Sequence, residues 1–189
     1  TSQERVNYVS DYTEAILNVK KNAPAFSLNV SDKVSYPNDA LIVVSAPENA
    51  VGNIKYTVLD SNKNVVYTIT QSCKDNLTVQ GLNAGIYEIN GVFEGDDLYD
   101  STDNIRLAFM VYPSDVSMTL QFNNITYGQD LVITPEFSKQ NVEGSITYVI
   151  GDKVATLPAN ETLVLSGLDE GNYNIAAFYM GCDNYNSCI

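Results

Sequence analysis

Histidine is absent from this 189-residue chain, and its absence excludes several kinds of chemistry. Catalysis by Ser-His-Asp or Cys-His groups needs an imidazole base. The three cysteines include no Cys-x-x-Cys pair, so a zinc site is not expected either. No glycine-rich phosphate-binding loop precedes a helical pattern. We therefore predict that the chain is not an enzyme and, apart from one candidate calcium site, has no cofactor.

Basic residues and long apolar runs are also scarce. The chain has 10 Lys and Arg against 23 Asp and Glu, which gives a net charge of -13. Proteins that bind nucleic acids neutralise phosphates with Lys and Arg, so we expect no nucleic-acid partner. The same argument excludes an anionic membrane surface. No run approaches the roughly 20 apolar residues of a membrane-spanning helix, so membrane insertion is not expected in this segment.

The residues that are abundant favour β-structure. Tyrosine occurs 13 times and tryptophan never, and Val, Ile and Thr are frequent, as in pleated, half-buried sheets. In residues 53–59, Ile54, Tyr56 and Val58 alternate with polar residues, which is typical of a strand with one buried face. Further short strands are separated by turn residues at intervals of about ten residues. The sequence therefore predicts an all-β fold.

Four sequence blocks occur twice, in the same order, which indicates an internal repeat. The paired blocks are residues 34–39 and 125–130, 52–58 and 144–150, 81–89 and 167–175, and 95–101 and 181–187. The chain therefore holds two copies of a unit of about 90 residues, a typical size for a β-sandwich domain.

The third pair of blocks carries a Leu-x-x-Gly-x-Tyr-x-Ile pattern. Its first copy runs from Leu82 to Ile89 and its second from Leu168 to Ile175. A tyrosine after such a turn buries its ring and donates its hydroxyl back to the turn, the tyrosine corner of immunoglobulin-like sandwiches. We therefore predict structural roles for Tyr87 and Tyr173. The predicted fold is two tandem immunoglobulin-like β-sandwich units with an N-terminal strand-like arm.

This late Leu-x-x-Gly-x-Tyr pattern, followed by Gly-Asp-Asp-x-Tyr-x-Ser, resembles the immunoglobulin-like repeats of adhesin-like surface proteins of methanogenic archaea and some bacteria. The matching residues are Gly85, Tyr87, Gly95, Asp96, Tyr99 and Ser101 in the first unit, and Gly171, Tyr173, Gly181, Tyr185 and Ser187 in the second. The second copy departs from the pattern at Cys182, where the first has Asp96. The resemblance implies an extracellular, cell-surface location and a role in adhesion or as a stalk, and it carries over no catalytic residues.

The two ends of the chain do not coincide with unit boundaries. The predicted domains are an arm at 1–22, a first sandwich at 23–112 and a second at 113–189 that stops before its final strand. The arm looks like the last strand of a preceding unit, because residues 11–16 align with 100–105 and Pro24 aligns with Pro113.

Two explanations account for this phase. The chain is an excerpt of a longer array, consistent with its start at Thr1 rather than Met, or copies join head to tail by strand addition. In the second case Ala15, Ile16, Leu17 and Val19 of the arm complete the unfilled sandwich of a neighbour. The expected partners are therefore adjacent repeats or further copies of the chain.

Two clusters are candidate binding or cross-linking sites. Glu94, Asp96, Asp97 and Asp100 form the densest acidic group; it is either a solvated loop or a calcium site between units, since calcium takes oxygen ligands. Cys182 and Cys188 flank a short polar loop and are either a disulfide, in an oxidising compartment, or two free thiols.

Four Asn-x-Ser/Thr sequons, at Asn29, Asn76, Asn124 and Asn160, predict N-glycosylation of a surface protein. The primary functional hypothesis is a structural and adhesive repeat module acting as a stalk, adhesin or filament subunit. The alternative is a domain that binds a host-cell or cell-surface glycan or protein at a site on the first unit. That site would lie in its longer middle part, residues 52–81, which includes Cys73.

Overall fold

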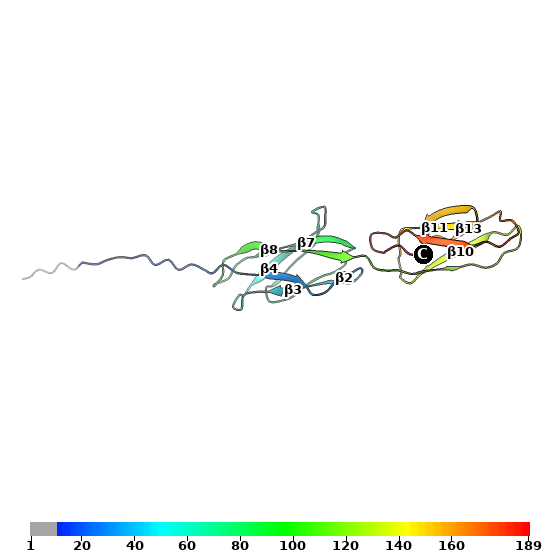
Figure 1. Ribbon diagram of the computed structural model, residues 1–189. Coiled ribbons are helices and arrows are strands. Elements are labelled where there is room, and N and C mark those ends of the chain that lie inside the picture. Colours follow the sequence, from blue (N-terminus) through cyan, green and yellow to red (C-terminus); the bar gives the residue numbers. More distant parts are fainter. Residues whose placement is uncertain (1–10) are drawn as a thin grey trace, which may run out of the picture.

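The computed structural model describes residues 11–189, which form two β-sandwiches in series and contain no helix. Figure 1 shows the N-terminal arm leading away from the first sandwich, on the side opposite the second. The predicted all-β class and the two tandem sandwiches are confirmed. Within the described residues there is accordingly no helix that is long and apolar enough to cross a membrane.

The first sandwich packs a three-stranded sheet against a five-stranded one. The three-stranded sheet has the order β1 (Ser27–Val30), β3 (Ala40–Ser45) and β6 (Leu77–Val79). The five-stranded sheet has the order β2 (Val34–Ser35), β8 (Thr102–Tyr112), β7 (Gly85–Phe93), β4 (Asn53–Leu59) and β5 (Val65–Ser72). All neighbours are antiparallel except β2 and β8, which are parallel.

Strict alternation along the strands produces the core between these sheets. Ile54, Tyr56 and Val58 of β4 are fully buried, and Phe93 at the end of β7 packs on Phe26 with ring centroids 4.9 Å apart. Because successive side chains of a strand point to opposite faces, the polar residues between them face solvent. Burial of such apolar side chains stabilises a fold by about 1.5–3 kcal/mol each.

The second sandwich has two three-stranded sheets. One has the order β9 (Met118–Gln121), β10 (Leu131–Phe137) and β13 (Leu163–Leu165). The other has the order β12 (Lys153–Pro158), β11 (Ser145–Ile150) and β14 (Ile175–Tyr179). β7 lies between β4 and β8, whereas its counterpart β14 pairs with β11 on one side and, among the described residues, makes only an isolated bridge from Tyr179 to Cys188 on the other.

Both predicted tyrosine corners are confirmed. The Tyr87 hydroxyl donates to the Asn83 carbonyl at 2.8 Å, and the Tyr173 hydroxyl donates to the Asp169 carbonyl at 3.1 Å. In each unit the acceptor carbonyl lies four residues before the tyrosine, in the turn that leads into the strand. They differ in their surroundings, because Tyr87 is only 8% exposed and Tyr173 is 37% exposed.

The part of the arm that the structure describes, residues 11–22, is extended and lies outside both cores. Its apolar side chains face solvent: Ile16 is 99% exposed and Leu17 is 87% exposed. The arm contacts the first sandwich at its end, where Asn22 forms a parallel bridge with Tyr99 and the Lys21 ammonium donates to the Asp96 carbonyl. Residues 1–10, which belong to the predicted arm, lie outside the described part of the chain.

Candidate functional site

The strongest candidate site is a groove on the second sandwich, beside the free edge of β14. It has a volume of about 400 Å³. Its walls are residues 122–127, Leu131, residues 168–173 and Ile175. In the first sandwich the counterpart of this edge is covered by β8. A sheet edge exposes a row of unpaired backbone groups, so this groove can accept an additional strand.

The side chains beside β14 confirm that this is core surface left uncovered. In the first sandwich, Phe109 of β8 stacks on the Tyr87 ring with centroids 5.6 Å apart. Ile89, two residues further along β7, is fully buried. Their counterparts Tyr173 and Ile175 are exposed and half-buried, respectively. The second sandwich therefore presents apolar surface where the first has packed β8 against it.

The chain approaches this edge again at its C-terminal end. Cys188 pairs with Tyr179 through two backbone hydrogen bonds, of 2.9 and 3.1 Å. In the first sandwich the matching pair is Phe93 and Thr102, where β8 begins. Cys188 therefore occupies the position of the first residue of β8, beside Tyr179, whereas the groove lies at the other end of β14, beside Ile175.

A second feature is the junction between the sandwiches, formed where the chain leaves β8. The backbone of Ser114 pairs with the loop around Tyr185: its amide donates to Asn184, and its carbonyl accepts from Asn186, both at 2.9 Å. The Ser114 hydroxyl donates to the Tyr36 carbonyl. Only Pro113 separates this pairing from β8, so the linker has little freedom.

Side chains of both sandwiches extend the junction. The Asn184 side-chain oxygen accepts from the Ala84 amide at 2.8 Å, and its NH₂ donates to the Asn83 side chain at 3.2 Å. The Tyr36 and Tyr185 rings meet edge to face with centroids 5.5 Å apart. Such aromatic pairs contribute about 0.5–1.5 kcal/mol beyond their buried area. Sequence reasoning recognised both tyrosines as repeat residues but not their contact.

One of the predicted calcium ligands, Asp96, has another role in the structure. Among the described residues, no group of three or more acidic, cysteine or histidine side chains is placed to hold a metal ion. Asp96 instead accepts three backbone hydrogen bonds, from Val51 at 2.8 Å, Leu98 at 2.8 Å and Tyr99 at 2.7 Å. These bonds lower the pKa of Asp96 below its ordinary value, and the bond from the Val51 amide has the largest effect. The structure therefore does not bring Glu94, Asp96, Asp97 and Asp100 together as a metal site.

The cysteines are free thiols. Of the two alternatives for Cys182 and Cys188, a disulfide or two free thiols, the structure has the two free thiols, and both residues are half-buried. Burial raises the pKa of the Cys188 thiol. Cys73 is fully buried in the first core with its sulfur 3.8 Å from the Ala50 carbonyl, and burial raises its pKa as well. Cys73 is therefore a core residue of the longer middle part of the first unit.

The four sequons lie on the surface. Asn29, Asn76, Asn124 and Asn160 are all exposed, so glycosylation at these positions stays a prediction. The Asn76 side chain differs from the others because its oxygen accepts from the Val44 amide at 3.1 Å. A glycan attached to Asn76 would have to extend past this bond between β3 and the turn that precedes β6.

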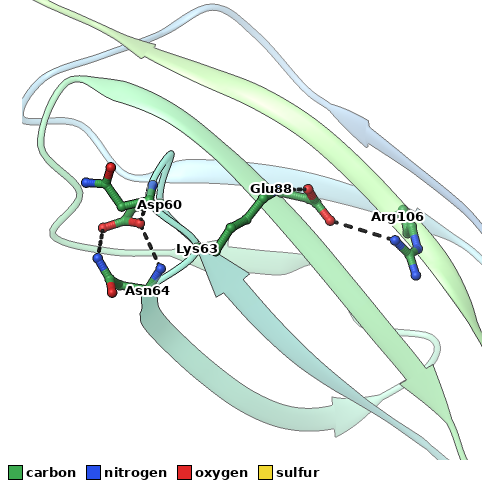
Figure 2. Close-up of polar contacts among 6 residues, drawn as sticks. Asp60, Lys63, Asn64, Glu88 and Arg106 are labelled. Carbon is green, nitrogen blue, oxygen red and sulfur yellow. Dashed lines mark hydrogen bonds and ion pairs between the residues drawn. The ribbon is translucent and has the colours of Figure 1, made fainter.

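In the first sandwich, polar residues of the longer middle part meet residues on the outer face of β7 and β8 (Figure 2). Lys63 donates to Glu88 at 2.7 Å, and Arg106 lies 3.9 Å from the same carboxylate. The hydrogen bond from Lys63 lowers the pKa of Glu88. Asp60 accepts from the Asn64 side chain at 3.1 Å and from backbone amides of its own turn. These groups satisfy one another, and solvated pairs of this kind contribute at most about 1 kcal/mol.

The arrangement of strands is similar to that of a known structure. No family model matches the chain, and no curated protein matches it. Among solved structures, a two fibronectin type-III domain segment from chicken tenascin is 16% identical with a TM-score of 0.53. The match covers 88% of this chain and 94% of that one. The chain thus has the fold of two tandem fibronectin type-III-like β-sandwich domains.

Proposed function

We propose that this chain is an extracellular structural and adhesive module that acts as a stalk, adhesin or filament subunit at a cell surface. The proposal combines the tandem fold with the resemblance to adhesin-like repeats of methanogenic archaea and some bacteria. The junction between the sandwiches is the observation that carries it. A spacer needs fixed joints, because a chain of domains on flexible linkers coils instead of projecting.

The junction provides such a joint. Ser114 continues the path of β8 directly into pairing with the Asn184–Asn186 loop, and Asn184 reaches back to the Asn83–Ala84 turn. The contacts therefore join the end of the first sandwich to the second on two sides of the linker. In repeat proteins each unit contacts mainly its neighbours, so a joint of this kind fixes the direction of a whole array.

The two ends of the module are complementary, which supports head-to-tail linkage by strand addition. One end presents an extended arm with exposed apolar side chains, and the other presents a sheet edge beside uncovered core. Strand addition supplies backbone hydrogen bonds along the edge and side-chain contacts in the groove. Strand addition of this kind would join copies into a filament, and no additional domain would be needed for the linkage.

The rigid-joint part of this proposal is tested by small-angle X-ray scattering of the monomeric fraction. The wild-type profile is expected to fit one elongated arrangement of the two sandwiches. Asn184→Ala removes the two bonds that the Asn184 side chain makes across the junction and should broaden the distribution of inter-domain angles. Asn186→Ala is the matched control, because its side chain bonds to Asp115 at 2.7 Å within the second sandwich. A wild-type ensemble as broad as that of Asn184→Ala would contradict the proposal.

The alternative function, a glycan or protein site on the first unit, has less support. The polar cluster that Asp60, Lys63 and Asn64 of its longer middle part form with Glu88 and Arg106 is paired within itself (Figure 2). A binding surface would be expected to leave donors or acceptors free for a ligand. Binding of glycans or of a host protein by the first unit would be measured with arrays of immobilised glycans and cell-surface extracts.

A further inference from the structure

The arm corresponds in position to β8, and the structure fixes this correspondence. Asn22 and Ser114 make the same contacts: each donates its amide to, and accepts with its carbonyl from, the loop that follows β7 or β14. For Asn22 the partners are Leu98 and Asp100, and for Ser114 they are Asn184 and Asn186, all at 2.9 Å. Asn22 is therefore the equivalent of Ser114, the second residue after β8.

A second pairing gives the same spacing independently. Ser27 of β1 pairs with Ser45, and Thr119 of β9 pairs with Glu136, at corresponding places in the two sandwiches. Ser27 and Thr119 are as far apart in the sequence as Asn22 and Ser114. Two separate sets of backbone bonds thus relate the beginning of one unit to the beginning of the next.

The same separation in the sequence, applied to the residues before Asn22, pairs each side chain of the arm with one of β8. Thr13, Ala15, Leu17 and Val19 take the places of Ile105, Leu107, Phe109 and Val111. The last four residues form the inward face of β8: Ile105, Phe109 and Val111 are buried, and Leu107 packs against the core. The arm therefore carries small and apolar side chains on the face that a last strand buries. Ile16 takes the place of exposed Ala108 and points outward.

This register differs by three residues from the one that the sequence suggests. Alignment of residues 11–16 with 100–105 equates Ile16 with Ile105, which would place Asn18 and Lys20 on the inward face. Burial of a charged ammonium without a partner is costly. The backbone pairing of Asn22 removes this conflict, because it shifts the polar residues to the solvent side.

We propose that the groove beside β14 is filled by residues 13–19 of a second copy of this chain, antiparallel to β14. This inference rests on the proposed head-to-tail linkage and names its partner and register. β8 pairs with β7 so that Val111 faces Gly85, Phe109 faces Tyr87, Leu107 faces Ile89 and Ile105 faces Gly91. The same register on β14 sets Val19 opposite Gly171, Leu17 opposite Tyr173, Ala15 opposite Ile175 and Thr13 opposite Ala177. Leu17 then covers the exposed Tyr173 ring as Phe109 covers Tyr87.

Residues outside the inserted segment 13–19 also favour a second copy of the chain as the occupant of the groove. Tyr127, the counterpart of Tyr36, is 80% exposed. In the inserted arrangement the incoming copy brings Tyr99, the counterpart of Tyr185, to Tyr127. Lys20 and Lys21 of the arm follow Val19, and they come to the turn that holds Asp169 and Glu170. This opposite charge favours the arm over a neutral strand and would be screened by salt.

The arm cannot fill the groove of its own chain. It leaves the first sandwich on the side opposite the second (Figure 1), whereas the groove belongs to the second sandwich. Insertion therefore links different copies, and because each copy has one arm and one groove, the contact is heterologous and builds chains. Cys188 occupies the position of Thr102, the first residue of β8, and Thr13 takes that of Ile105, three positions later.

The test compares two arm variants of the full 189-residue chain. Leu17→Lys places a charge on the inward face, and Ile16→Lys places the same charge one residue away on the outward face. Analytical ultracentrifugation should show concentration-dependent head-to-tail oligomers for the wild type and for Ile16→Lys. Leu17→Lys should raise the dissociation constant at least tenfold. Both side chains lie outside the folded cores, so equal melting temperatures of the monomeric fractions check that folding is intact.

A synthetic peptide of residues 11–22 provides a second arm of the experiment. It should compete with assembly of the wild type, and a peptide carrying Leu17→Lys should not. A wild type that stays monomeric at millimolar concentration and ignores the peptide would overturn the inference. Equal losses from both variants, or a larger loss from Ile16→Lys, would overturn the register. The rigid joint of the proposed function is measured separately on the monomeric fraction, so the two proposals can fail independently.

Discussion

The two tyrosine corners allow a prediction within a single molecule, because they have the same geometry and different exposure. Tyr87→Phe and Tyr173→Phe each remove one hydroxyl and leave the ring in place. The Tyr87 bond to Asn83, at 2.8 Å, is partly buried, whereas the Tyr173 bond to Asp169, at 3.1 Å, is exposed. Burial also raises the pKa of Tyr87 above its ordinary value. The two substitutions should therefore have unequal effects.

The loss of unfolding free energy depends on whether the acceptor carbonyl finds another hydrogen-bond partner after the hydroxyl is removed. A hydrogen bond contributes about 1 ± 0.5 kcal/mol net, and an acceptor left buried without a partner costs about 1–3 kcal/mol. Tyr87→Phe should therefore lower the unfolding free energy of the first sandwich by about 1–2 kcal/mol. Water can replace the hydroxyl at Asp169, so Tyr173→Phe should lower that of the second by about 0.5 kcal/mol or less.

Amide hydrogen exchange of the monomeric fraction, read by mass spectrometry, reports the two sandwiches separately, which a global melting curve does not. Core peptides of the first sandwich should exchange about 5–30 times faster in Tyr87→Phe, by the relation between free energy and population. Those of the second should change by about twofold or less in Tyr173→Phe. Tyr12→Phe, in the exposed arm, is the control and should change neither. An equal or larger effect of Tyr173→Phe would refute the assignment of Tyr173 to an uncovered edge.

Three further predictions concern stability. Phe109→Ala should destabilise the first sandwich by about 3–5 kcal/mol in urea unfolding, since it removes a buried ring, and a loss below about 1 kcal/mol would contradict its place in the core. The pKa of Asp96 is lowered in the folded state, so the Asp96 carboxylate binds a proton more readily in the unfolded chain. Ionised Asp96 therefore stabilises the fold at pH values above the ordinary pKa of Asp, and this stabilisation is lost as the pH falls through the folded-state pKa. Asp96→Asn should therefore flatten the acid side of the stability profile, and an unchanged profile would exclude this role. Gly144→Ala should lower the melting temperature of the second sandwich more than Gly128→Ala; both have positive φ, but an added Cβ lies 2.6 Å from the Gly181 carbonyl at Gly144 and meets nothing within 4 Å at Gly128.

Much of the fold could be predicted from local pattern. Alternation of apolar and polar residues in 53–59 fixes which side of β4 is buried, because side chains alternate along a strand. The repeated Leu-x-x-Gly-x-Tyr-x-Ile pattern predicts both tyrosine corners, since the donor and the acceptor lie four residues apart in the same turn. Contacts this close in sequence depend little on the rest of the structure.

The candidate site could be predicted only in outline. The sequence predicts that the arm resembles a last strand and that the counterpart of β8 is not among residues 113–189. The acidic loop shows the limit of composition: Asp96 looks like a metal ligand beside its neighbours, but its oxygens accept from Val51, Leu98 and Tyr99. One of these amides comes from a distant loop, so no local pattern could reveal the bond.

What the sequence by itself determined is the all-β class and the repeat. These follow from short-range periodicity and self-similarity, which each strand and turn carries on its own. The register of the arm was decided by tertiary structure alone. Ile16 and Ile105 look equivalent as letters, but the backbone bonds of Asn22 and Ser114 place Thr13 at the position of Ile105. A shift of one residue exchanges the faces of a strand, so only these long-range hydrogen bonds could establish that Leu17 and Val19, and not Ile16, correspond to the inward face of β8.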